Sequence, residues 1–409
     1  MIYGLIGEHL GHSFSPEIHA QIGPEPYTLR ELAPDQLASF LAERDFDGIN
    51  VTIPYKQAVM PYLDEISPTA RAIGAVNTIL RRDGRLLGDN TDAAGLARLI
   101  RRTGIEMAGK KVLILGTGGT SRTALYTARA LGAAEVLRVS RSAREGALTY
   151  EEAARLHSDA GVILNTTPCG MYPNAEDQPI DLAAFPRLTG VIDAIYNPLR
   201  SRLVLSARAR GIPAAGGLYM LAAQAVRAAE LFRDTAYPDM LTEEIYQNLL
   251  RQKENIELIG MPGCGKSAVG AALAERLGRR LADTDQAVAE QAGLPIPEIF
   301  ARYGENRFRE LESQAIADLS ARSGLVIATG GGAVLRAENV ERLRRNGRLY
   351  WLDRPLEDLA ATADRPLSDT REKLERLYRE RRPAYQAAAD EIIPVTGTPQ
   401  DVARRIESR

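Results

Sequence analysis

Two segments of this 409-residue chain share one pattern, in which a short apolar run leads into a glycine-rich loop and then into an amphipathic stretch. One covers residues 111–131 and the other covers residues 255–277. Glycines after a strand let several backbone N–H groups converge on a phosphate, and the helix that follows directs its positive end toward that phosphate. Because a strand, a glycine loop and a helix in this order start a parallel sheet, the chain is predicted to contain at least two α/β domains.

Apolar runs alternate with amphipathic segments over the whole chain, which indicates an α/β fold class with mostly parallel sheets. Short runs of strand character lie at 112–115, 162–164, 191–192, 256–259 and 326–328. A chain of this length can form two or three domains of ordinary size. Since the polar, helix-like segment 241–254 precedes the second glycine loop, we place the domains at 1–250 and 254–409.

The charge balance excludes a strong global field, because 51 Lys and Arg residues face 53 Asp and Glu residues. Nothing therefore draws the chain as a whole to nucleic acid or to an anionic membrane. The two cysteines, Cys169 and Cys264, lack the spacing of a disulfide or zinc framework. Neither a signal peptide nor a run of about 18 apolar residues is present. We expect a cytoplasmic protein with small-molecule substrates, without nucleic-acid or membrane partners, and leave its oligomeric state open.

The second glycine loop, Gly260–Ser267, fits the nucleotide-binding pattern G-x-x-x-x-G-K-[ST] between a strand and a helix. Gly263 and Gly265 would let backbone N–H groups reach the phosphates of ATP. Lys266 would lie along the β- and γ-phosphates, and the hydroxyl of Ser267 would hold Mg²⁺. A glycine turn that matches by chance is the alternative.

Two carboxylates follow the next strand-like stretch, in the string Asp283-Thr-Asp285. Asp283 could anchor the hydration shell of the metal ion, and Asp285 could hold the hydroxyl groups of a polar acceptor. A solvated acidic turn is the other interpretation of this string. A glycine loop alone indicates that a nucleotide binds, but it does not identify the phosphoryl acceptor. The motifs farther along the chain are needed to identify that second substrate.

From about residue 255 to 409 the chain resembles shikimate kinase. After the glycine loop, the motifs of that family occur in its order: Asp283-Thr-Asp285, Phe308-Arg309-x-x-Glu312, Thr329-Gly-Gly-Gly332, Arg365-Pro-Leu367 and Arg381-x-Pro-x-Tyr385. The resemblance implies a P-loop kinase fold like that of the nucleoside monophosphate kinases. It also implies ATP and Mg²⁺ as cofactors and shikimate as the phosphoryl acceptor.

By this resemblance Asp285, Arg309, Gly331 and Arg381 bind shikimate, and the two arginines bind its carboxylate as bidentate donors. Arg365 would approach the transferring phosphoryl group from a mobile lid. The sequence departs from the family at the lid, where residues 361–362 read Ala-Thr instead of the frequent Arg-Thr pair, and the segment up to Arg365 is short.

The first glycine loop could bind the pyrophosphate of a dinucleotide through Gly116, Gly118 and Gly119, although Ser121 replaces the third glycine of the usual pattern. An ordinary glycine turn is the alternative. The next strand is followed by Ser140 and Arg141, with Arg144 close behind. A basic residue at this point meets a ribose 2′-phosphate, whereas an acid would bind the 2′-hydroxyl, so the pattern favours NADP(H) over NAD.

Over about the first 247 residues the chain resembles shikimate dehydrogenase. The resemblance is carried by polar clusters in family order: Ser13-x-Ser15-Pro, Asn50-Val-Thr52-x-Pro-x-Lys56, Gly74-x-x-Asn77-Thr, Gly88-x-Asn-Thr-Asp92, Asn165-Thr166-Thr-Pro, Asp193-x-x-Tyr196 and Gly216-Gly217-Leu-Tyr-Met-Leu-x-x-Gln224. It implies two lobes with the active site between them. The Rossmann-type NADP lobe would cover about 100–221, with Thr166 and Gly217 at the cofactor, and the substrate lobe about 1–99 and 222–250.

Reduction of a ketone by hydride leaves an alkoxide that must gain a proton, so a cationic donor is needed near that oxygen. By the resemblance Lys56 is this donor, and Asp92 orients its ammonium group in a dyad with coupled titrations. The side chains implied to hold the substrate carboxylate and ring hydroxyls are Ser13, Ser15, Thr52, Asn77, Tyr196 and Gln224.

Together the two resemblances predict a bifunctional enzyme of the chorismate pathway, which supplies the aromatic amino acids. It would reduce 3-dehydroshikimate to shikimate with NADPH and then phosphorylate shikimate to shikimate 3-phosphate with ATP. Three alternatives stay open: a regulatory or weakly active kinase-like half, a quinate-accepting dehydrogenase that uses NAD, and a transcriptional regulator. Retention of Lys56, Asp92, Lys266 and Asp285, and the lack of a basic patch, argue against the regulator.

Overall fold

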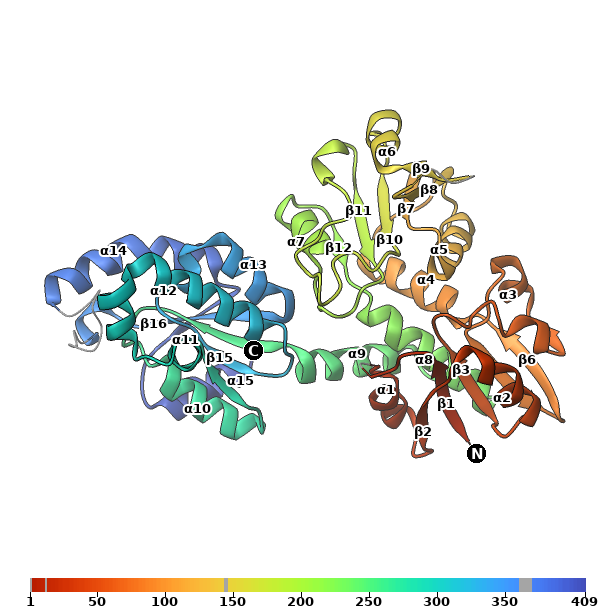
Figure 1. Cartoon of the computed structure of the whole chain (residues 1–409), viewed down its shortest axis with the longest axis horizontal. Helices are drawn as coiled ribbons and strands as arrows, with labels where there is room; N and C mark the ends of the chain where they lie inside the picture. The colour runs from red at the N-terminus through yellow and green to blue at the C-terminus, as the bar shows by residue number, and fades with distance from the viewer. Residues whose placement is uncertain (1, 12, 143–145, 360–369) are drawn as a thin grey trace. The chain divides into compact units, whose positions relative to one another are not determined.

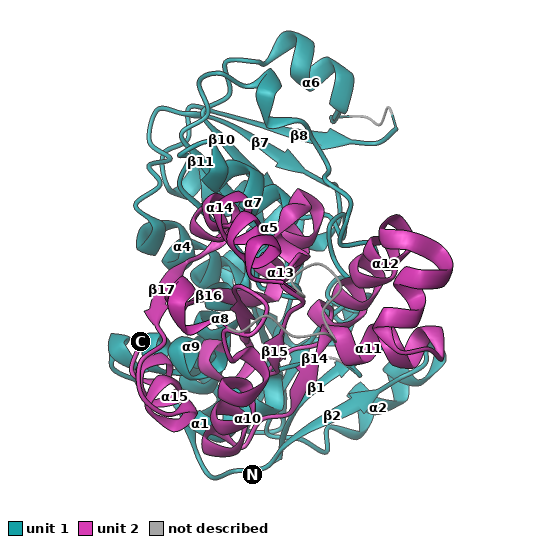
Figure 2. Ribbon diagram, turned by 90° about the vertical axis from the view of Figure 1, so that its left-hand side faces the viewer, with its two compact units in different colours: residues 1–249 teal, residues 250–409 magenta. Residues whose placement is uncertain are grey.

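The computed structural model describes residues 2–11, 13–142, 146–359 and 370–409. The chain forms two compact units, Met1–Leu249 and Leu250–Arg409, which differ in colour in Figure 2. The division falls inside helix α9 (Asp239–Lys253), which is labelled in Figure 1. Within the described ranges, the model contains no helix of the length and apolar character that a bilayer crossing requires.

The first part of unit 1 is built on a mixed sheet with the strand order β2-β1-β3-β5-β6-β4. Its elements are β1 (Tyr3–Gly7), α1 (Ser15–Ile22), β2 (Tyr27–Glu31), α2 (Leu37–Glu43), β3 (Gly48–Val51), β4 (Glu65–Ile66), α3 (Pro68–Ile73), β5 (Thr78–Arg82) and β6 (Arg85–Asp89). Strands β2, β1 and β3 run parallel, whereas β5 is antiparallel to β3 and β6. The hairpin turns at Asp83 and Gly84, which both have positive φ, as a two-residue Asp-Gly turn requires.

The second part of unit 1 is a fully parallel sheet with the order β12-β11-β10-β7-β8-β9. Its elements are β7 (Lys111–Leu115), α5 (Gly119–Ala130), β8 (Glu135–Ser140), β9 (Leu148–Thr149), α6 (Tyr150–Leu156), β10 (Val162–Asn165), β11 (Gly190–Asp193), α7 (Arg202–Ala209) and β12 (Ala214–Ala215). Apolar clusters cover both faces of this sheet, which explains why its strands are continuous hydrophobic runs. The predicted Rossmann-type sheet is confirmed.

Two helices, α4 (Thr91–Thr103) and α8 (Leu218–Arg233), run between the two sheets and pack against each other. The predicted lobe limits at 99/100 and 221/222 fall inside these helices. A glycine permits their close approach, because a Cβ on Gly95 would lie 2.7 Å from the carbonyl oxygen of Met220 and 3.0 Å from Cβ of Gln224. The position of Gln224 therefore depends on how closely α4 and α8 approach each other.

Unit 2 contains a parallel sheet with the order β14-β15-β13-β16-β17. Its elements are β13 (Asn255–Ile259), α10 (Lys266–Leu277), β14 (Leu281–Asp283), α11 (Thr284–Ala292), α12 (Ile296–Ser320), β15 (Val326–Ala328), α13 (Ala337–Asn346), β16 (Gly347–Asp353), α14 (Arg371–Ala388), β17 (Glu391–Pro394) and α15 (Pro399–Glu407). Helix α12 is interrupted at Gly304, which has φ +77°. The parallel P-loop sheet expected from the sequence is confirmed.

Candidate active sites

A cavity of about 340 Å³ in unit 1 collects side chains from both of its sheets. All eight residues predicted to act in catalysis or substrate binding in this half line it: Ser13, Ser15, Thr52, Lys56, Asn77, Asp92, Tyr196 and Gln224. They lie up to 211 positions apart in the sequence, as the numbers of Ser13 and Gln224 show. The fold therefore brings the predicted set to one place, and their individual roles stay predictions.

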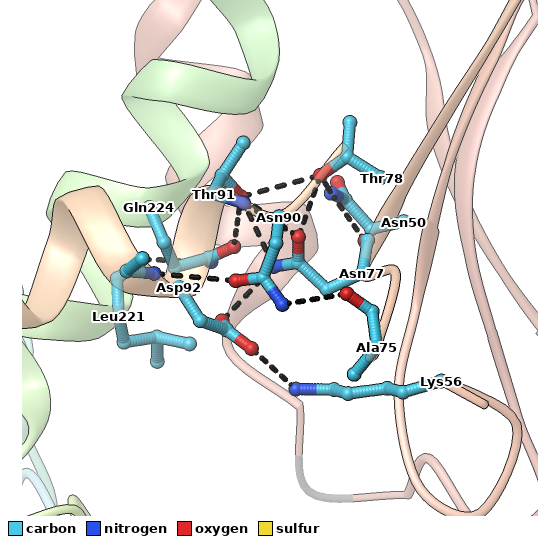
Figure 3. Close-up of polar contacts among 11 residues, drawn as sticks. Asn50, Lys56, Ala75, Asn77, Thr78, Asn90, Thr91, Asp92, Leu221 and Gln224 are labelled. Atoms are coloured by element: carbon cyan, nitrogen blue, oxygen red, sulfur yellow. Dashed lines mark hydrogen bonds and ion pairs between the residues drawn. The ribbon is translucent and has the colours of Figure 1, made fainter. Parts of the chain in front are cut away.

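The Lys56–Asp92 pair lies in the lower half of the close-up in Figure 3, where the lysine extends toward the carboxylate. Nζ of Lys56 donates to Oδ2 of Asp92 at 2.5 Å, and the two side chains are 17% and 10% exposed. Asp92 stands in the first turn of α4, where the helix dipole favours a negative charge. The pair is thus an ammonium group held at the cavity wall, in a position to give a proton to a bound oxygen.

Asn77 fixes the other oxygen of Asp92, since its Nδ2 donates to Oδ1 of Asp92 at 2.9 Å. The same Nδ2 donates to Oγ1 of Thr91 at 3.0 Å, and the backbone N–H of Thr91 donates to Oδ1 of Asn77 at 2.7 Å. The Thr91 hydroxyl also reaches Oε1 of Gln224 on α8, at 3.4 Å. Figure 3 shows this network joining α4, the β3–β5 region and α8.

Two serines line the cavity, Ser13 just before α1 and Ser15 as the first residue of that helix. Ser13 Oγ lies 3.1 Å from Ser15 Oγ, and the backbone N–H of Ser15 donates to Ser13 Oγ. Phe14, between them, packs on Tyr196 with ring centroids 5.3 Å apart. Burial raises the pKa of the Tyr196 phenol, so its hydroxyl remains a donor at neutral pH. These contacts give the cavity a wall rich in hydroxyl donors that suits a carboxylate and ring hydroxyls.

The first glycine loop leaves room for a dinucleotide pyrophosphate. Gly116 has φ +110°, and no protein atom lies within 4 Å of where a Cβ would stand on Gly118 or Gly119. Helix α5 begins at Gly119, so its first turn faces that space. Thr166 donates its hydroxyl to the carbonyl oxygen of Leu115 at 2.6 Å and so closes the loop from the neighbouring strand.

The remaining cofactor residues lie around the same sheet edge. Ser140 is the buried last residue of β8, and Arg141 follows it with an exposed side chain. Gly217 lines the cavity and faces the carbonyl oxygen of Ala194 so closely that no side chain would fit. Arg144 lies outside the described residues. The residues present fit a phosphorylated ribose at the end of β8, and this assignment stays a prediction.

In unit 2 the P-loop surrounds the ammonium group of its own lysine. Nζ of Lys266 donates to the carbonyl oxygens of Gly260 and Met261 at 2.9 and 3.0 Å, and its side chain is buried. Gly265 is the N-cap of α10 with φ +101°, and Gly263 has φ +82°. The loop thus has the curved backbone in which N–H groups point inward to bind phosphate oxygens.

Ser267 and Asp283 face each other beside this loop, with Ser267 Oγ donating to Asp283 Oδ2 at 2.8 Å. The other oxygen of Asp283 caps α11 by accepting from the backbone N–H groups of Asp285 and Gln286. Mg²⁺ prefers oxygen ligands, so the Ser267 hydroxyl and the Asp283 carboxylate beside the phosphate-binding loop fit this ion. Because the described part of the chain has no cluster of three or more His, Cys, Asp or Glu side chains arranged for a metal, phosphates and waters would complete the coordination.

A cavity of about 530 Å³ extends from the P-loop to the predicted acceptor residues. Asp285, Arg309, Gly331 and Arg381 all line it, together with Gly263, Gly265, Lys266, Ser267 and Asp283. Nη1 of Arg381 donates to the carbonyl oxygen of Gly331 at 2.8 Å, which holds one arginine against the glycine loop after β15. The predicted lid residue Arg365, with Ala361 and Thr362, lies outside the described residues.

Asp285 is a half-buried acid of this cavity, which the fully buried Glu312 also lines. Burial foremost, and then the nearby charge of Asp283, raise its pKa to about 6. A Cβ on Gly330 would lie 2.6 Å from Oδ1 of Asp285 and 2.5 Å from Oε1 of Glu312, so two carboxylates approach one glycine. Arg309 donates to Glu312 at 2.7 Å and balances part of this negative charge.

Comparisons with known proteins agree with this geometry. A family model described as "Shikimate dehydrogenase substrate binding domain" matches residues 5–79, and one described as "Shikimate kinase" matches residues 262–409. The shikimate dehydrogenase (NADP(+)) of Clostridium perfringens strain SM101 is 35% identical over 266 residues, which is 61% of this chain and 98% of that protein. That of Geobacillus kaustophilus is 38% identical over 252 residues, covering 56% and 91%. The chain belongs to the shikimate dehydrogenase family.

Solved structures give the same result for the shikimate dehydrogenase half. A chorismate mutase/shikimate 5-dehydrogenase fusion protein from Clostridium acetobutylicum superposes with a TM-score of 0.58 at 35% identity, covering 61% of this chain and 96% of that one. The shikimate 5-dehydrogenase of Thermus thermophilus, in complex with NADP(H) and shikimate, does so with a TM-score of 0.55 at 32% identity, covering 61% and 99%. Both resemblances inferred from the motifs are confirmed, and residues 262–409 form a shikimate kinase domain.

Several residues in or next to the shikimate dehydrogenase cavity stand in the quoted motifs but were given no role by sequence reasoning. Asn50 lines the cavity. Thr78 and Thr91 do not line it, but they accept hydrogen bonds from Asn50 and Asn77. In the kinase domain the same holds for Glu312 and for Tyr385, whose hydroxyl donates to the carbonyl oxygen of Gly331. All five lie within or beside the quoted motifs, so their place in the motif was a usable signal.

Proposed function

We propose that the chain is a bifunctional enzyme that reduces 3-dehydroshikimate to shikimate with NADPH and phosphorylates shikimate to shikimate 3-phosphate with ATP and Mg²⁺. The observation that carries the proposal is the convergence of the predicted catalytic and substrate-binding residues, within the described ranges, in two separate cavities. One set has an ammonium group beside a carboxylate, and the other has a phosphate loop beside a half-buried acid. Because the first reaction makes the substrate of the second, the two assignments support each other although each rests on its own residues.

In the dehydrogenase site, bound NADPH would supply a hydride to the ketone carbon. The proton for the resulting alkoxide would come from Nζ of Lys56, which Asp92 holds at 2.5 Å. Asn77 keeps Asp92 in place through its 2.9 Å hydrogen bond. Ser13 and Ser15 would bind the substrate carboxylate, so that the ring presents its ketone to Lys56. In the reverse direction the same lysine would accept the proton from the hydroxyl.

In the kinase site, the chain's own residues position the acceptor and neutralise charge. Arg309 and Arg381 would bind the carboxylate of shikimate, and Asp285 would accept the proton of the attacking hydroxyl, a task that a pKa of about 6 suits. Lys266 would leave the loop carbonyls for the β- and γ-phosphates of ATP. Mg²⁺ would be held at Ser267 and Asp283. The phosphoryl group passes to the acceptor oxygen and ADP leaves.

Two lysine variants test the assignment in the purified full chain. Lys56→Ala should lower kcat for reduction by about 10²- to 10⁴-fold, since it removes the proton donor, and should leave phosphorylation of shikimate unchanged. Lys266→Ala should do the reverse, because it removes the cation that faces the phosphates. NADPH consumption and ADP release are measured separately for each variant. Loss of both activities from either single change, in a folded chain, would contradict the two-site proposal.

Cofactor choice is tested in the same assays. Arg141 follows β8 at the point where a ribose 2′-phosphate would lie, so we expect kcat/KM with NADP⁺ to exceed that with NAD⁺ in the oxidation of shikimate. A preference for NAD⁺, or for quinate over shikimate, would favour the alternative dehydrogenase. We also propose a cytoplasmic location, which the two free cysteines, Cys169 and Cys264, support.

A further inference from the structure

A tyrosine outside every motif hydrogen-bonds into the dehydrogenase site. Tyr27 begins β2, the edge strand of the first sheet, and is partly buried. Its hydroxyl donates to Oδ1 of Asn50 at 2.7 Å. Asn50 is 5% exposed and lines the cavity that contains Lys56. Tyr27 itself does not line that cavity, so any influence on the substrate must pass through its neighbours.

Asn50 uses its whole amide group in this arrangement. Its Oδ1 accepts from Tyr27, while its Nδ2 donates to the carbonyl oxygen of Asn77 at 3.2 Å and to Oγ1 of Thr78 at 3.0 Å. A rotated amide would place Nδ2 against the Tyr27 hydroxyl and Oδ1 against the Asn77 carbonyl oxygen, which cannot donate. The Asn77 carbonyl oxygen therefore selects one of the two amide orientations, and in that orientation the Tyr27 hydroxyl donates to Oδ1 and holds the amide from its other side.

From Asn50 the hydrogen bonds continue to the proton donor. The Thr78 hydroxyl donates to Oδ1 of Asn77 at 3.1 Å, Nδ2 of Asn77 donates to Oδ1 of Asp92 at 2.9 Å, and Lys56 donates to Asp92. Figure 3 shows the part of this chain from Asn50 to Lys56 as one connected set of dashed contacts. Each link joins buried or partly buried groups, where a hydrogen bond is stronger than in water.

The ring of Tyr27 is held in place by its neighbours on the other side. It stacks on the imidazole of His19 with centroids 3.8 Å apart and 8° between the planes. Burial lowers the pKa of His19 to about 3, with Arg233 adding to the effect, so the imidazole is neutral in the folded chain. Burial also raises the pKa of the Tyr27 phenol well above its usual value, partly offset by the nearby Ser15 hydroxyl. The hydroxyl thus remains a donor.

We propose that Tyr27 is a positioning residue for the reduction, which acts by fixing the amide of Asn50 and, through Asn77, the Asp92–Lys56 pair. The inference rests on the proposed dehydrogenase function. It differs from a merely structural role, in which the Tyr27 hydroxyl would only satisfy the buried Asn50 amide and its loss would change stability alone. A positioning role predicts a change in turnover that depends on Asn50.

Two phenylalanine variants separate these roles in the full chain. Tyr27→Phe keeps the ring stacked on His19 and removes the hydroxyl. Tyr3→Phe is the matched control, because Tyr3 is a buried tyrosine paired with Tyr27 across β1 and β2, its ring stacks on Phe232 with centroids 5.0 Å apart, and it does not line the cavity. We expect Tyr27→Phe to lower kcat/KM for 3-dehydroshikimate about tenfold, the equivalent of one buried hydrogen bond, mainly through kcat. Tyr3→Phe should leave it unchanged.

A double-mutant cycle with Asn50→Ala completes the test. If Tyr27 acts through Asn50, Tyr27→Phe should have no further effect on kcat/KM in the Asn50→Ala background. If Tyr27→Phe lowered kcat/KM equally in the wild-type and Asn50→Ala backgrounds, or if Tyr27→Phe were as active as Tyr3→Phe, the positioning role would be overturned. In either case, reduction of 3-dehydroshikimate by the wild-type chain would still support the proposed function. A wild-type chain that does not reduce 3-dehydroshikimate would overturn both. Phosphorylation of shikimate, measured in parallel, should be equal in all variants and reports the amount of chain in each assay, while thermal unfolding reports that unit 1 is folded.

Discussion

Asp92 and Asp285 occupy equivalent places in their units, each in the first turn of a helix, yet their neighbours give them different chemistry. Asp92 is paired with Lys56 and accepts from Asn77, so both of its oxygens are occupied. Asp285 is half-buried near a second acid, Asp283, and its pKa is raised to about 6. The first arrangement orients a cation, whereas the second produces a carboxylate that can take up a proton near neutral pH.

The kinase activity should therefore depend on pH through Asp285. Since kcat/KM reports the free enzyme, it should be low when Asp285 is protonated, and should rise with pH through about 6. The sign follows from the raised pKa: the folded state holds the proton up to about pH 6, so the active carboxylate is lost as the pH falls below that value. The profile of ADP release with shikimate from about pH 5 to about pH 8, roughly one unit below that pKa to two units above it, measures this.

Asp285→Asn is the variant that assigns the profile. It should lower kcat for phosphorylation by about 10²- to 10⁴-fold, because an amide cannot accept the hydroxyl proton. Reduction of 3-dehydroshikimate by the same preparation is the control and should be unchanged. A flat profile in the wild type, or an Asp285→Asn variant with nearly normal turnover, would show that Asp285 does not accept this proton.

Motif reasoning could identify the residues that carry charge or a special backbone, such as Lys56, Asp92 and Lys266, because few residue types can replace them at a phosphate loop or a proton-donor site. It could not identify Tyr27, which acts on the motif residue Asn50 from a different strand. Only the strand order reveals such a pair. The pairing of Glu312 with Arg309 is different, because the two residues lie three positions apart on one helix and within one motif.

At the level of elements, the packing of α4 on α8 connects the substrate-binding sheet to the nucleotide-binding sheet. Asp92 lies in α4 and Gln224 in α8, and the two helices meet at Gly95. Glycine is normally unfavourable inside a helix by about 1 kcal/mol, so its presence here reflects the close approach. The sequence predicted the strands and both glycine loops because their patterns are local. The β5–β6 hairpin, and hence the mixed sheet, were not anticipated, although the Asp83-Gly84 pair is a hairpin signal.

Gly95→Ala should weaken the dehydrogenase although it favours helix formation. The new methyl group would stand 2.7 Å from the carbonyl oxygen of Met220, so α8 must move, and Met220 and Gln224 of the cavity move with it. We expect a higher KM for 3-dehydroshikimate and a loss of about 1–3 kcal/mol in stability, as overpacking usually produces. Steady-state kinetics and thermal unfolding measure the two effects.

The matched control is Gly270→Ala in α10, another helical glycine. There the methyl group would meet the end of the Leu281 side chain at 2.9 Å, and Leu281 is 38% exposed and able to turn aside. This variant should be close to the wild type in stability and in both activities. If Gly95→Ala behaved in the same way, the separation of α4 and α8 would not control the cavity.

The whole molecule combines two units, each with its own glycine loop and its own cavity, and unit 1 has two sheets where unit 2 has one. The chain length predicted more than one domain, because 409 residues exceed what one hydrophobic core usually supports. The division between the units lies inside α9, a helix that continues across it. Because both sites belong to one chain, shikimate released by the dehydrogenase meets a raised effective concentration of the kinase site. A shared chain does not by itself require direct transfer of shikimate from one site to the other.

In the proposed function, the ketone oxygen of 3-dehydroshikimate becomes a hydroxyl in unit 1, and the same oxygen is phosphorylated in unit 2. The most direct measurement supplies the purified chain with 3-dehydroshikimate, NADPH deuterated at the transferred position, ATP and Mg²⁺, and identifies the product by mass spectrometry. We predict shikimate 3-phosphate that carries deuterium on the carbon bearing the phosphate, with Lys266→Ala stopping at deuterated shikimate. Deuterated shikimate that accumulates without phosphate in the wild type, or a product without deuterium, would contradict the proposed sequence of reduction and phosphorylation.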